Sequence, residues 1–451
     1  MATEQPEGAV QPVVRPGMLT DRYELTMLSS WLRDGTANHR AVFECFARRL
    51  PAGRRYGVVA GLGRLLPLIR DFRFATGDID YLLESGAITD AAATFLADFR
   101  FGGSIDAYRE GELYFPGSPV LTVVGTLAEC CILETLVLSV LNHDSAIASA
   151  AARMVVAAGD RPLIEMGSRR THEQAAIACA RAAYLAGFAS TSNLAAGSVY
   201  GIPTVGTAAH AFTLSHSTER DAFASQVAAL GPQTTLLVDT FDTAQGIRTA
   251  VEVAGPRLGA IRLDSGDLDI EAANARTLLD SLGATATRIT VTSDLDEYVI
   301  AALAQAPIDG FGVGTRLVTG SGHPTASLVY KLVAVADSAD PAAPLRSVAK
   351  TATGKASLGG RKAAYRTLDV DGLTTGERIV LDGDVAPVAA RLLTHEVMCD
   401  GEISGLPTLD ESREFHRSAR AELGAEHLSI ADGEAAFAAV REGSVREGST
   451  R

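Results

Sequence analysis

The chain has 451 residues, of which 47 % are hydrophobic and 21 % charged, a composition typical of a globular protein long enough for two domains. The net charge of −14 argues against a nucleic acid or an anionic membrane as partner. The five cysteines include no C-x-x-C pair, and their odd number fits a reducing cytosol. Glu134 and Arg181 interrupt the apolar stretches 127–141 and 175–189, so neither is expected to span a bilayer. These features predict a soluble cytoplasmic protein.

The first 157 residues combine helical and strand patterns. Their predicted elements are, in order, a helix with Tyr23 that Thr20 or Asp21 caps, a strand at 41–47, helices over 58–100, short strands over 101–125 and a long helix over 127–157. Four arginines follow the first strand closely, at Arg48, Arg49, Arg54 and Arg55. Such a cluster is usually a solvated loop, but it also suits an anion at a subunit boundary.

From about 160 to 320, strand-like runs recur every twenty to thirty residues, mostly with amphipathic helical segments between them. The runs and the polar residues that end them lie at 163–170, 188–193, 204–210, 236–239, 260–267, 289–294 and 308–315. Repeated β-α units imply parallel strands, and seven of them favour a barrel over a small open sheet. We therefore expect an α/β fold in which the polar strand ends converge on one face.

Beyond residue 320 the β-α alternation stops. Residues 328–335 are apolar, short strands near 364–369 and 378–394 suit a small β-rich domain, and 409–440 is expected to be helical. Between them lies a basic, glycine-containing segment with Arg346, Lys350, Lys355, Arg361, Lys362 and Arg366. A charge run is most often a solvated face, but a cationic loop also suits a polyphosphate. The predicted division is an N-terminal α+β domain at 1–125, a barrel at 126–325, and a C-terminal segment at 326–451 that packs with the N-terminal domain.

His210 lies in Gly206-Thr-Ala-Ala-His210, directly after a short β-branched run. A strand in that run places the imidazole at the carboxyl end of a parallel sheet, where α/β folds carry their chemistry. A lone histidine there is more often a packing residue. The other strand ends weigh against that alternative, because they supply groups that act together.

Those groups are cations, carboxylates and a glycine-rich turn. Arg169, Arg170 and Arg262 are suited to a carboxylate or a phosphate. The backbone amides of the turn from Gly310 to Thr315, which includes Gly312 and Gly314, suit a phosphate. Asp264 and Asp267 follow Arg262 and suit sugar hydroxyls or Mg²⁺. A capped turn from strand to helix would have the same sequence pattern. Asp239 could equally cap a helix. The combination indicates phosphoryl or phosphoribosyl transfer.

The sequence resembles the nicotinate phosphoribosyltransferase family over about residues 16 to 440. The similar motifs, in the family's order, are Leu19-Thr-Asp-Arg-Tyr-Glu-Leu-Thr-Met27, Gly167-Ser-Arg-Arg170, Gly206-Thr-Ala-Ala-His210, Ile261-Arg-Leu-Asp-Ser-Gly-Asp267, Thr292-Ser-Asp-Leu-Asp296, Phe311-Gly-Val-Gly-Thr315 and Val329-Tyr-Lys-Leu332. The resemblance implies a barrel-like core of the type II phosphoribosyltransferase kind. It also implies a homodimer with sites at the subunit interface.

The implied reaction joins nicotinate to phosphoribosyl pyrophosphate, which yields nicotinate mononucleotide and pyrophosphate for NAD biosynthesis. It is implied to require Mg²⁺ and to be coupled to ATP hydrolysis through a phosphohistidine at His210, with His216 outside the motif as the competing candidate.

The remaining residues are implied to bind the substrates. Tyr23, from the same or the partner subunit, stacks on nicotinate, Thr207 contacts it, and Arg262 pairs with its carboxylate. Thr315, with Gly312 and Gly314, takes the phosphoribosyl phosphate, and Arg169, Asp264 and Asp294 are further site residues. Met166-Gly-Ser168 stands where commoner members of the family often have an aromatic residue or leucine.

The residues leave three alternative functions open. A nicotinamide-specific transferase shares the predicted barrel. A phosphate-binding barrel lyase or aldolase would need a Schiff-base lysine, and no lysine lies in the predicted barrel strands. An inactive regulatory binder is disfavoured by the intact His210 and Arg262 motifs.

Overall fold

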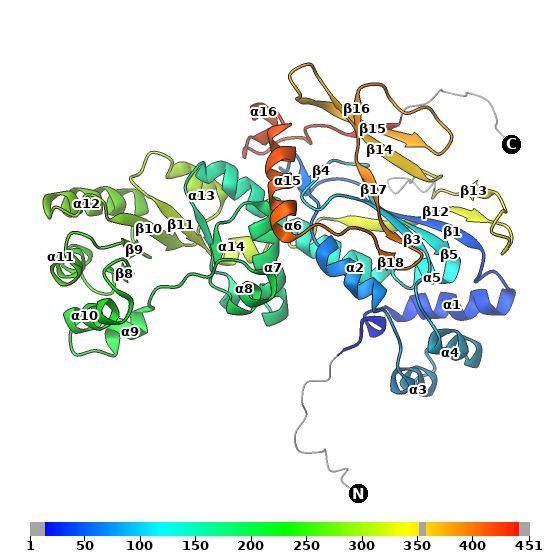
Figure 1. The fold of residues 1–451 in the computed structure, drawn as a ribbon, viewed down its shortest axis with the longest axis horizontal. Coiled ribbons are helices and arrows are strands. Elements are labelled where there is room, and N and C mark those ends of the chain that lie inside the picture. Colours follow the sequence, from blue (N-terminus) through cyan, green and yellow to red (C-terminus); the bar gives the residue numbers. More distant parts are fainter. Residues whose placement is uncertain (1–13, 351–357, 442–451) are drawn as a thin grey trace, which may run out of the picture.

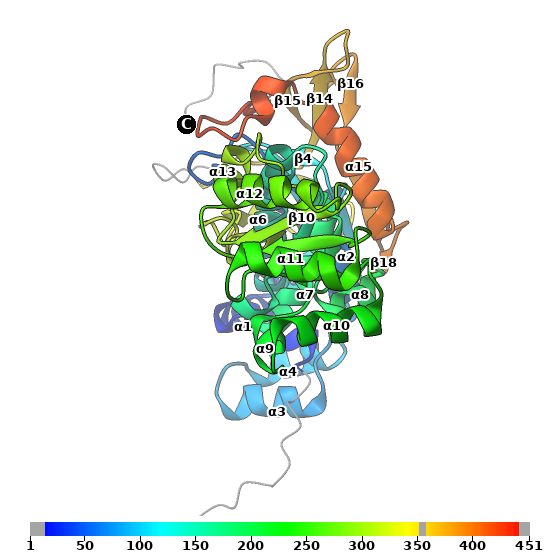
Figure 2. The ribbon, with the colours of Figure 1, turned by 90° about the vertical axis from the view of Figure 1, so that its left-hand side faces the viewer.

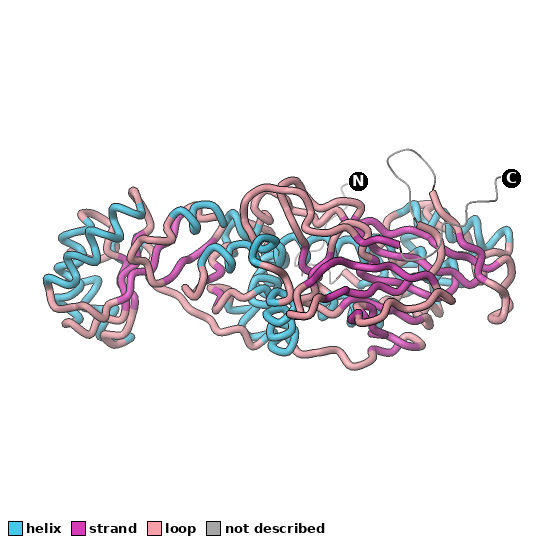
Figure 3. The backbone as a smooth tube through the Cα atoms, turned by 90° about the horizontal axis from the view of Figure 1, so that it is seen from above, coloured by secondary structure: helices cyan, strands magenta, loops and turns pink. Residues whose placement is uncertain are grey.

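The computed structural model describes residues 14–350 and 358–441. The molecule is elongated, with a parallel sheet at one end and antiparallel sheets at the other (Figures 1 and 3). Two helices, α6 (Glu134–Ala158) and α7 (Glu173–Ala186), pack against each other between the two ends.

The parallel sheet has six strands in the described residues, in the order β7-β6-β11-β10-β9-β8. Their bounds are β6 (Leu163–Glu165), β7 (Ser190–Thr191), β8 (Thr235–Leu237), β9 (Ala260–Leu263), β10 (Arg288–Ser293) and β11 (Gly310–Val313). The remaining helices of this half are η2 (Ser168–Arg170), α8 (Leu194–Tyr200), α9 (His210–Leu214), α10 (Glu219–Leu230), α11 (Thr243–Ala254), α12 (Leu268–Ser281), α13 (Glu297–Ala302) and α14 (Thr315–Val318). Figure 2 shows α10, α11 and α12 side by side over this sheet.

The parallel α/β core agrees with the sequence prediction, but where a barrel-like core was expected the described strands form a six-stranded half-barrel with two free ends. β7 and β8 are the two ends of the sheet. The predicted strand before His210 forms only one bridge, between Thr191 and Thr204. Pro203 has no N–H to donate, and the segment from Pro203 to Thr207 is exposed, so little burial stabilises a longer strand there.

The large antiparallel sheet joins the two ends of the chain. Its order is β13-β12-β1-β5-β3-β17-β18, with β1 (Arg40–Ala47), β3 (Ser104–Tyr108), β5 (Pro119–Thr126), β12 (Leu328–Ala336), β13 (Leu345–Ser347), β17 (Thr394–Cys399) and β18 (Glu402–Ile403). The early strand β1 lies between β5 and the late strand β12, antiparallel to both. The domain boundaries at 125 and 325 stay a prediction.

Two smaller sheets complete this half. A four-stranded sheet consists of β16 (Ala390–Leu392), β14 (Lys362–Leu368), β15 (Thr374–Leu381) and β19 (Ala439–Arg441), and β2 (Gly57–Val58) pairs with β4 (Leu113–Tyr114). The expected helix over 409–440 is wrong in its second half. The structure has α15 (Leu409–Ala421) and the short α16 (Ala425–Leu428), after which β19 adds parallel to β15. β19 forms through its contact with β15, and no local sequence pattern in residues 439–441 predicts it.

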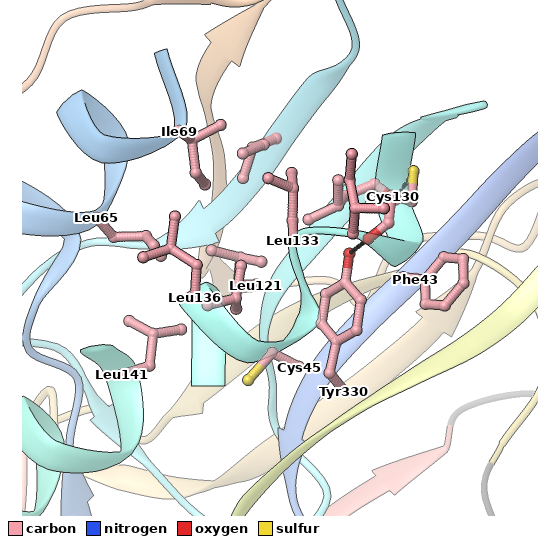
Figure 4. Packing of buried hydrophobic residues seen from close by; sticks show 14 of the residues in the cluster. Phe43, Cys45, Leu65, Ile69, Leu121, Cys130, Leu133, Leu136, Leu141 and Tyr330 are labelled. Atoms are coloured by element: carbon pink, nitrogen blue, oxygen red, sulfur yellow. Dashed lines mark hydrogen bonds between the residues drawn. The ribbon is translucent and has the colours of Figure 1, made fainter. Parts of the chain in front are cut away.

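The N-terminal helices cover the large sheet. They are η1 (Pro16–Met18), α1 (Arg22–Asp34), α2 (Leu62–Arg70), α3 (Thr76–Glu84), α4 (Asp90–Ala97) and α5 (Leu127–Cys131). Asp21 precedes α1 as predicted, but its side chain makes no capping hydrogen bond, and the Thr20 hydroxyl bonds to Glu24 instead. Figure 4 shows the core between these layers, where the Tyr330 ring stacks on Phe43 and its hydroxyl donates to the Cys130 carbonyl over 2.9 Å.

The predicted helix over 127–157 is two helices, because α5 ends at Cys131 and α6 begins at Glu134. By length and composition the stretch Leu127–Ala158 could cross a membrane, but 67 % of its apolar window is buried inside the protein. Its apolar side chains pack in both large hydrophobic clusters. The stretch is therefore the central core segment that connects the two halves.

Candidate active site

A cavity of about 570 Å³ lies at the carboxyl ends of the parallel strands. Loops from different strands build it, because the carboxyl ends of parallel strands meet at one edge of a sheet. All the predicted site residues except Tyr23 and His210 line it: Arg169, Thr207, Arg262, Asp264, Asp294, Gly312, Gly314 and Thr315. A second cavity of about 200 Å³ adjoins the first and shares Thr207 and Arg262 with it.

Arg262 lies in β9 between the two cavities, and three neighbouring side chains hold it. Its Nε donates to Thr292 Oγ1 at 2.9 Å, one terminal nitrogen to Thr207 Oγ1 at 3.1 Å, and the other to Asp264 Oδ1 at 3.0 Å. A guanidinium has five N–H groups, so one N–H on each terminal nitrogen stays available. Two parallel N–H groups are the donor geometry that binds a carboxylate in a bidentate pair.

His210 is the first residue of α9, beside the cavity. Its Nδ1 lies 3.1 Å from Thr240 Oγ1, and its Nε2 lies 3.7 Å from Asp264 Oδ2. The side chain is 41 % exposed, so a substrate can reach it. The alternative histidine is placed differently, because His216 lies just after α9, its Nδ1 bonds to the Phe212 carbonyl in that helix at 2.8 Å, and its ring packs on Phe212.

Asp264 links His210 to Arg262. Burial acts to raise the pKa of Asp264, but the hydrogen bond from Thr292 and the charge of Arg262 outweigh it, so the pKa lies below its ordinary value. The Asp264 backbone N–H donates to Asp239 Oδ2 at 2.7 Å, and Ser265 Oγ donates to the same oxygen. Asp239 therefore supports the β9 loop, and the capping residue of α11 is Asp242.

The glycine turn after β11 approaches its neighbours closely. A Cβ on Gly312 would lie 2.6 Å from Thr292 Cγ2 and 2.7 Å from Met166 Sδ, so a larger residue would push these two side chains apart. Gly314 and Thr315 follow on the cavity wall. Beside the glycine turn, η2 supplies Arg169 and Arg170, both exposed. The cavity is thus cationic on this wall and carboxylate-bearing at Asp264 and Asp294.

Tyr23 lies far from this cavity within the chain. It belongs to α1, in the antiparallel half, whereas β8 to β11 occupy the opposite end (Figure 1). The residue is 46 % exposed. Burial of the hydroxyl and the nearby carboxylates of Glu134 and Glu24 raise the Tyr23 pKa well above its ordinary value, so the phenol stays protonated at neutral pH.

The basic segment 346–366 is not a free cationic loop in the described residues. Arg361 pairs with Asp106 at 2.6 Å, Lys362 with Glu44 at 2.5 Å, and the fully buried Arg366 with Glu377 at 3.1 Å. Arg346 pairs with Asp337 at the surface, and Lys355 lies outside the described residues. Asp106 and Glu44 come from distant parts of the chain, and Glu377 lies just beyond the segment, so the sequence between 346 and 366 contains none of these acids.

The structure adds two threonines that the sequence analysis did not single out. Thr240 contacts His210 and Thr292 contacts both Arg262 and Asp264. Thr240 directly follows the β8 run, so the strand-end rule that selected Asp239 applies to it as well. Thr292 lies inside β10, and only the pairing of β10 with β9 brings it to Arg262.

The comparisons with known proteins support the family that the sequence motifs indicate. The family model of the nicotinate phosphoribosyltransferase (NAPRTase) N-terminal domain matches residues 18–142. A nicotinate phosphoribosyltransferase of Mycobacterium tuberculosis (pncB1) is 55 % identical over 93 % of this chain and 94 % of that protein. The nicotinate phosphoribosyltransferase of Bacillus subtilis is 38 % identical over 78 % of this chain and 73 % of that protein.

A solved structure agrees with these relatives. The crystal structure of human nicotinic acid phosphoribosyltransferase superposes with a TM-score of 0.81 and 26 % identity, over 94 % of this chain and 98 % of that one. The chain belongs to the nicotinate phosphoribosyltransferase family.

Proposed function

We propose that this enzyme joins nicotinate to phosphoribosyl pyrophosphate in the cavity at the parallel strand ends, releasing nicotinate mononucleotide and pyrophosphate, as a step of NAD biosynthesis. The observation that carries the proposal is Arg262, held by three side chains with two N–H groups left for a carboxylate, on the wall of a cavity that also contains Arg169 and the Gly314-Thr315 turn. Nicotinate supplies the carboxylate, and the cationic wall takes the phosphates.

Different residues of the cavity bind the two substrates. Arg262 pairs with the nicotinate carboxylate, and Thr207 contacts the ring. Arg169, Gly312, Gly314 and Thr315 hold the phosphoribosyl pyrophosphate, with Asp294 at its ribose. Displacement at the ribose develops positive charge on the sugar and negative charge on the departing pyrophosphate, so cations placed on the pyrophosphate lower the barrier.

ATP hydrolysis is coupled to this reaction through His210. With the Nδ1 proton donated to Thr240, the lone pair of Nε2 attacks the γ-phosphorus of ATP, ADP leaves, and water later releases phosphate from the phosphohistidine. Asp264 lies beside both His210 and Arg262. A change of charge on His210 therefore changes the electrostatic potential at Asp264, the carboxylate that pairs with Arg262.

Mg²⁺ would be held where Asp264 lies on the cavity wall and Asp239, outside the wall, accepts from the Asp264 backbone N–H. Among the described residues, Asp239 Oδ1 is buried without a hydrogen-bond partner, whereas Oδ2 is fully used. No group of three or more His, Cys, Asp or Glu residues in the described ranges forms a metal cluster. Mg²⁺ commonly binds one or two carboxylates together with substrate phosphates, and Asp239 with Asp264 would hold it here. When bound, the ion neutralises phosphate charge.

The working unit is a cytoplasmic homodimer of the type II phosphoribosyltransferase kind. Tyr23 is exposed and does not line the cavity of its own chain, and α1 belongs to the antiparallel half of the molecule, so Tyr23 stacks on nicotinate in the site of a partner subunit.

The test measures mononucleotide formation from nicotinate and from nicotinamide, each with phosphoribosyl pyrophosphate and Mg²⁺, with and without ATP. Wild type is expected to use nicotinate and to be stimulated by ATP. His210→Ala should retain a basal rate and lose the stimulation, and Thr240→Val should weaken it, whereas His216→Ala should behave as wild type. Turnover of nicotinamide in preference to nicotinate would refute the proposed substrate, and ATP stimulation that survives in His210→Ala would refute the phosphohistidine.

A further inference from the structure

Glu165, the last residue of β6, is a fully buried carboxylate beneath the cavity. It has no ion-pair partner within the described ranges, and instead both oxygens accept hydrogen bonds. Oε1 accepts from the Gly167 backbone N–H and Oε2 from Thr191 Oγ1, each at 2.5 Å. A buried carboxylate is unfavourable unless its hydrogen bonds compensate, so these two donors account for its presence there.

The two donors belong to different cavity loops. Gly167 begins the η2 turn that carries Ser168, Arg169 and Arg170. Thr191 lies in β7, where its backbone bonds to the Pro203 carbonyl and to the Val205 N–H, both at 3.0 Å, directly before Gly206 and Thr207. One carboxylate therefore connects the loop that bears Arg169 to the segment that bears Thr207.

The η2 turn is also tightly packed on a third loop. A Cβ on Gly167 would lie 2.2 Å from Val318 Cγ1 and 3.1 Å from the Gly314 carbonyl oxygen, so the turn rests directly against α14 and the glycine turn. A second link runs beside Glu165, where Asn193 Nδ2 donates to Ser168 Oγ at 3.0 Å and the Asn193 N–H donates to Thr191 Oγ1 at 2.9 Å. A displacement of Gly167 would thus change the phosphate wall as well as the position of Arg169.

We propose that Glu165 is a positioning residue for the proposed transferase reaction, because it fixes the Arg169 loop relative to Thr207 and Gly314 without touching either substrate. Loss of the carboxylate should let the η2 turn move, and the phosphate-binding groups would then be spread over several arrangements. Binding of phosphoribosyl pyrophosphate should suffer more than turnover of the bound complex. This inference rests on the proposed function.

The test compares Glu165→Ala and Thr191→Val with their conservative counterparts, Glu165→Gln and Thr191→Ser. The first two should raise the KM for phosphoribosyl pyrophosphate at least tenfold and lower kcat less than threefold. Glu165→Gln should stay within threefold of wild type, since its amide oxygen can accept from Gly167 and its NH₂ can donate to Thr191 Oγ1. Thr191→Ser keeps the hydroxyl and should do the same.

Glu110→Ala is the matched control. Glu110 is also buried and also holds glycine amides, with Gly61 N–H at 2.6 Å and Gly63 N–H at 3.3 Å, but it pairs with Arg181 and does not line the cavity. Its removal should lower the thermal midpoint and leave the KM within threefold of wild type. An equal rise in KM for Glu110→Ala would show general destabilisation and overturn the inference.

Calorimetric titration with phosphoribosyl pyrophosphate separates the two proposals. A tenfold weaker Kd for Glu165→Ala supports the positioning role even if wild type shows no nicotinate turnover, a result that would refute only the proposed function. Folded Glu165→Ala with wild-type Kd and KM overturns the inference and leaves the function standing. If Glu165→Ala does not fold, Thr191→Val, which keeps the side-chain volume, decides by the same two measurements.

Discussion

Replacing Arg262 by lysine tests the substrate assignment most directly. Lysine keeps one positive charge near Asp264, so the carboxylate does not become unpaired. It loses the planar arrangement of N–H groups, however, and one ammonium cannot replace three fixed hydrogen bonds and also offer two parallel donors. The change should therefore affect recognition of a carboxylate more than the charge balance of the site.

The expected magnitude follows from the two N–H groups that the structure leaves available. A hydrogen bond to a charged group contributes about 1.5–3 kcal/mol. Loss of one such contribution from the bidentate pair corresponds to roughly a 10- to 150-fold decrease in kcat/KM, since about 1.4 kcal/mol is a factor of ten. Nicotinamide carries no charge at this position, so its interaction with Arg262 should change by less than fivefold.

The assay compares kcat/KM for nicotinate in wild type and Arg262→Lys with the inhibition constant of nicotinamide, which needs no turnover. Thermal unfolding of both proteins checks that the variant is folded. Equal factors for nicotinate and nicotinamide would mean that Arg262 does not pair with the carboxylate. An unchanged kcat/KM for nicotinate would remove Arg262 from the site altogether.

Three further predictions concern charge and stability. Despite burial, the Thr292 hydrogen bond and the charge of Arg262 hold the pKa of Asp264 below its ordinary value. The ionised carboxylate therefore stabilises the folded protein above that ordinary value, and this stabilisation is lost as the pH falls below it. Urea unfolding of Asp264→Asn should show a free energy of unfolding that depends less on pH between about pH 5 and pH 2. Burial lowers the pKa of His416 to about 4, so the unfolded chain binds a proton more readily than the folded one as the pH falls from about 6.5. The free energy of unfolding should fall by about 3 kcal/mol near pH 4 for this reason. His416→Gln should abolish this part of the acid dependence in the same urea assay. Arg366→Met leaves the fully buried Glu377 without its cation and should cost about 3–5 kcal/mol in urea unfolding, while kcat/KM at a permissive temperature stays near wild type; a selective loss of activity would instead place Arg366 in the site.

The core of the fold was predictable because its signals are local. Each parallel strand is a short apolar run followed by polar residues, and the helices between them have their own periodicity. Parallel connection then places every carboxyl end at one edge, so the convergence of Arg169, Arg262 and Asp294 on one cavity follows from chain order. Their roles in binding stay predictions.

The sheet edges and the pairing of charges were not predictable in this way. Whether the run before His210 joins the sheet depends on how much of it is buried, and exposure around Pro203 reduced it to one bridge. β19 exists because β15 offers it an edge, and nothing in residues 439–441 indicates that partner.

The sequence by itself determined the parallel α/β core, the family and the order of the groups that meet at its strand ends, because hydrophobic periodicity and motif spacing are properties of neighbouring residues. The tertiary structure alone decided that Lys362 and Arg366 neutralise Glu44 and Glu377 rather than face a phosphate, and that Tyr23 lies away from its own cavity. The Lys362–Glu44 pair joins residues more than 300 positions apart, and the Arg366–Glu377 pair depends on the pairing of β14 with β15. Burial makes those contacts strong, and no local pattern records them.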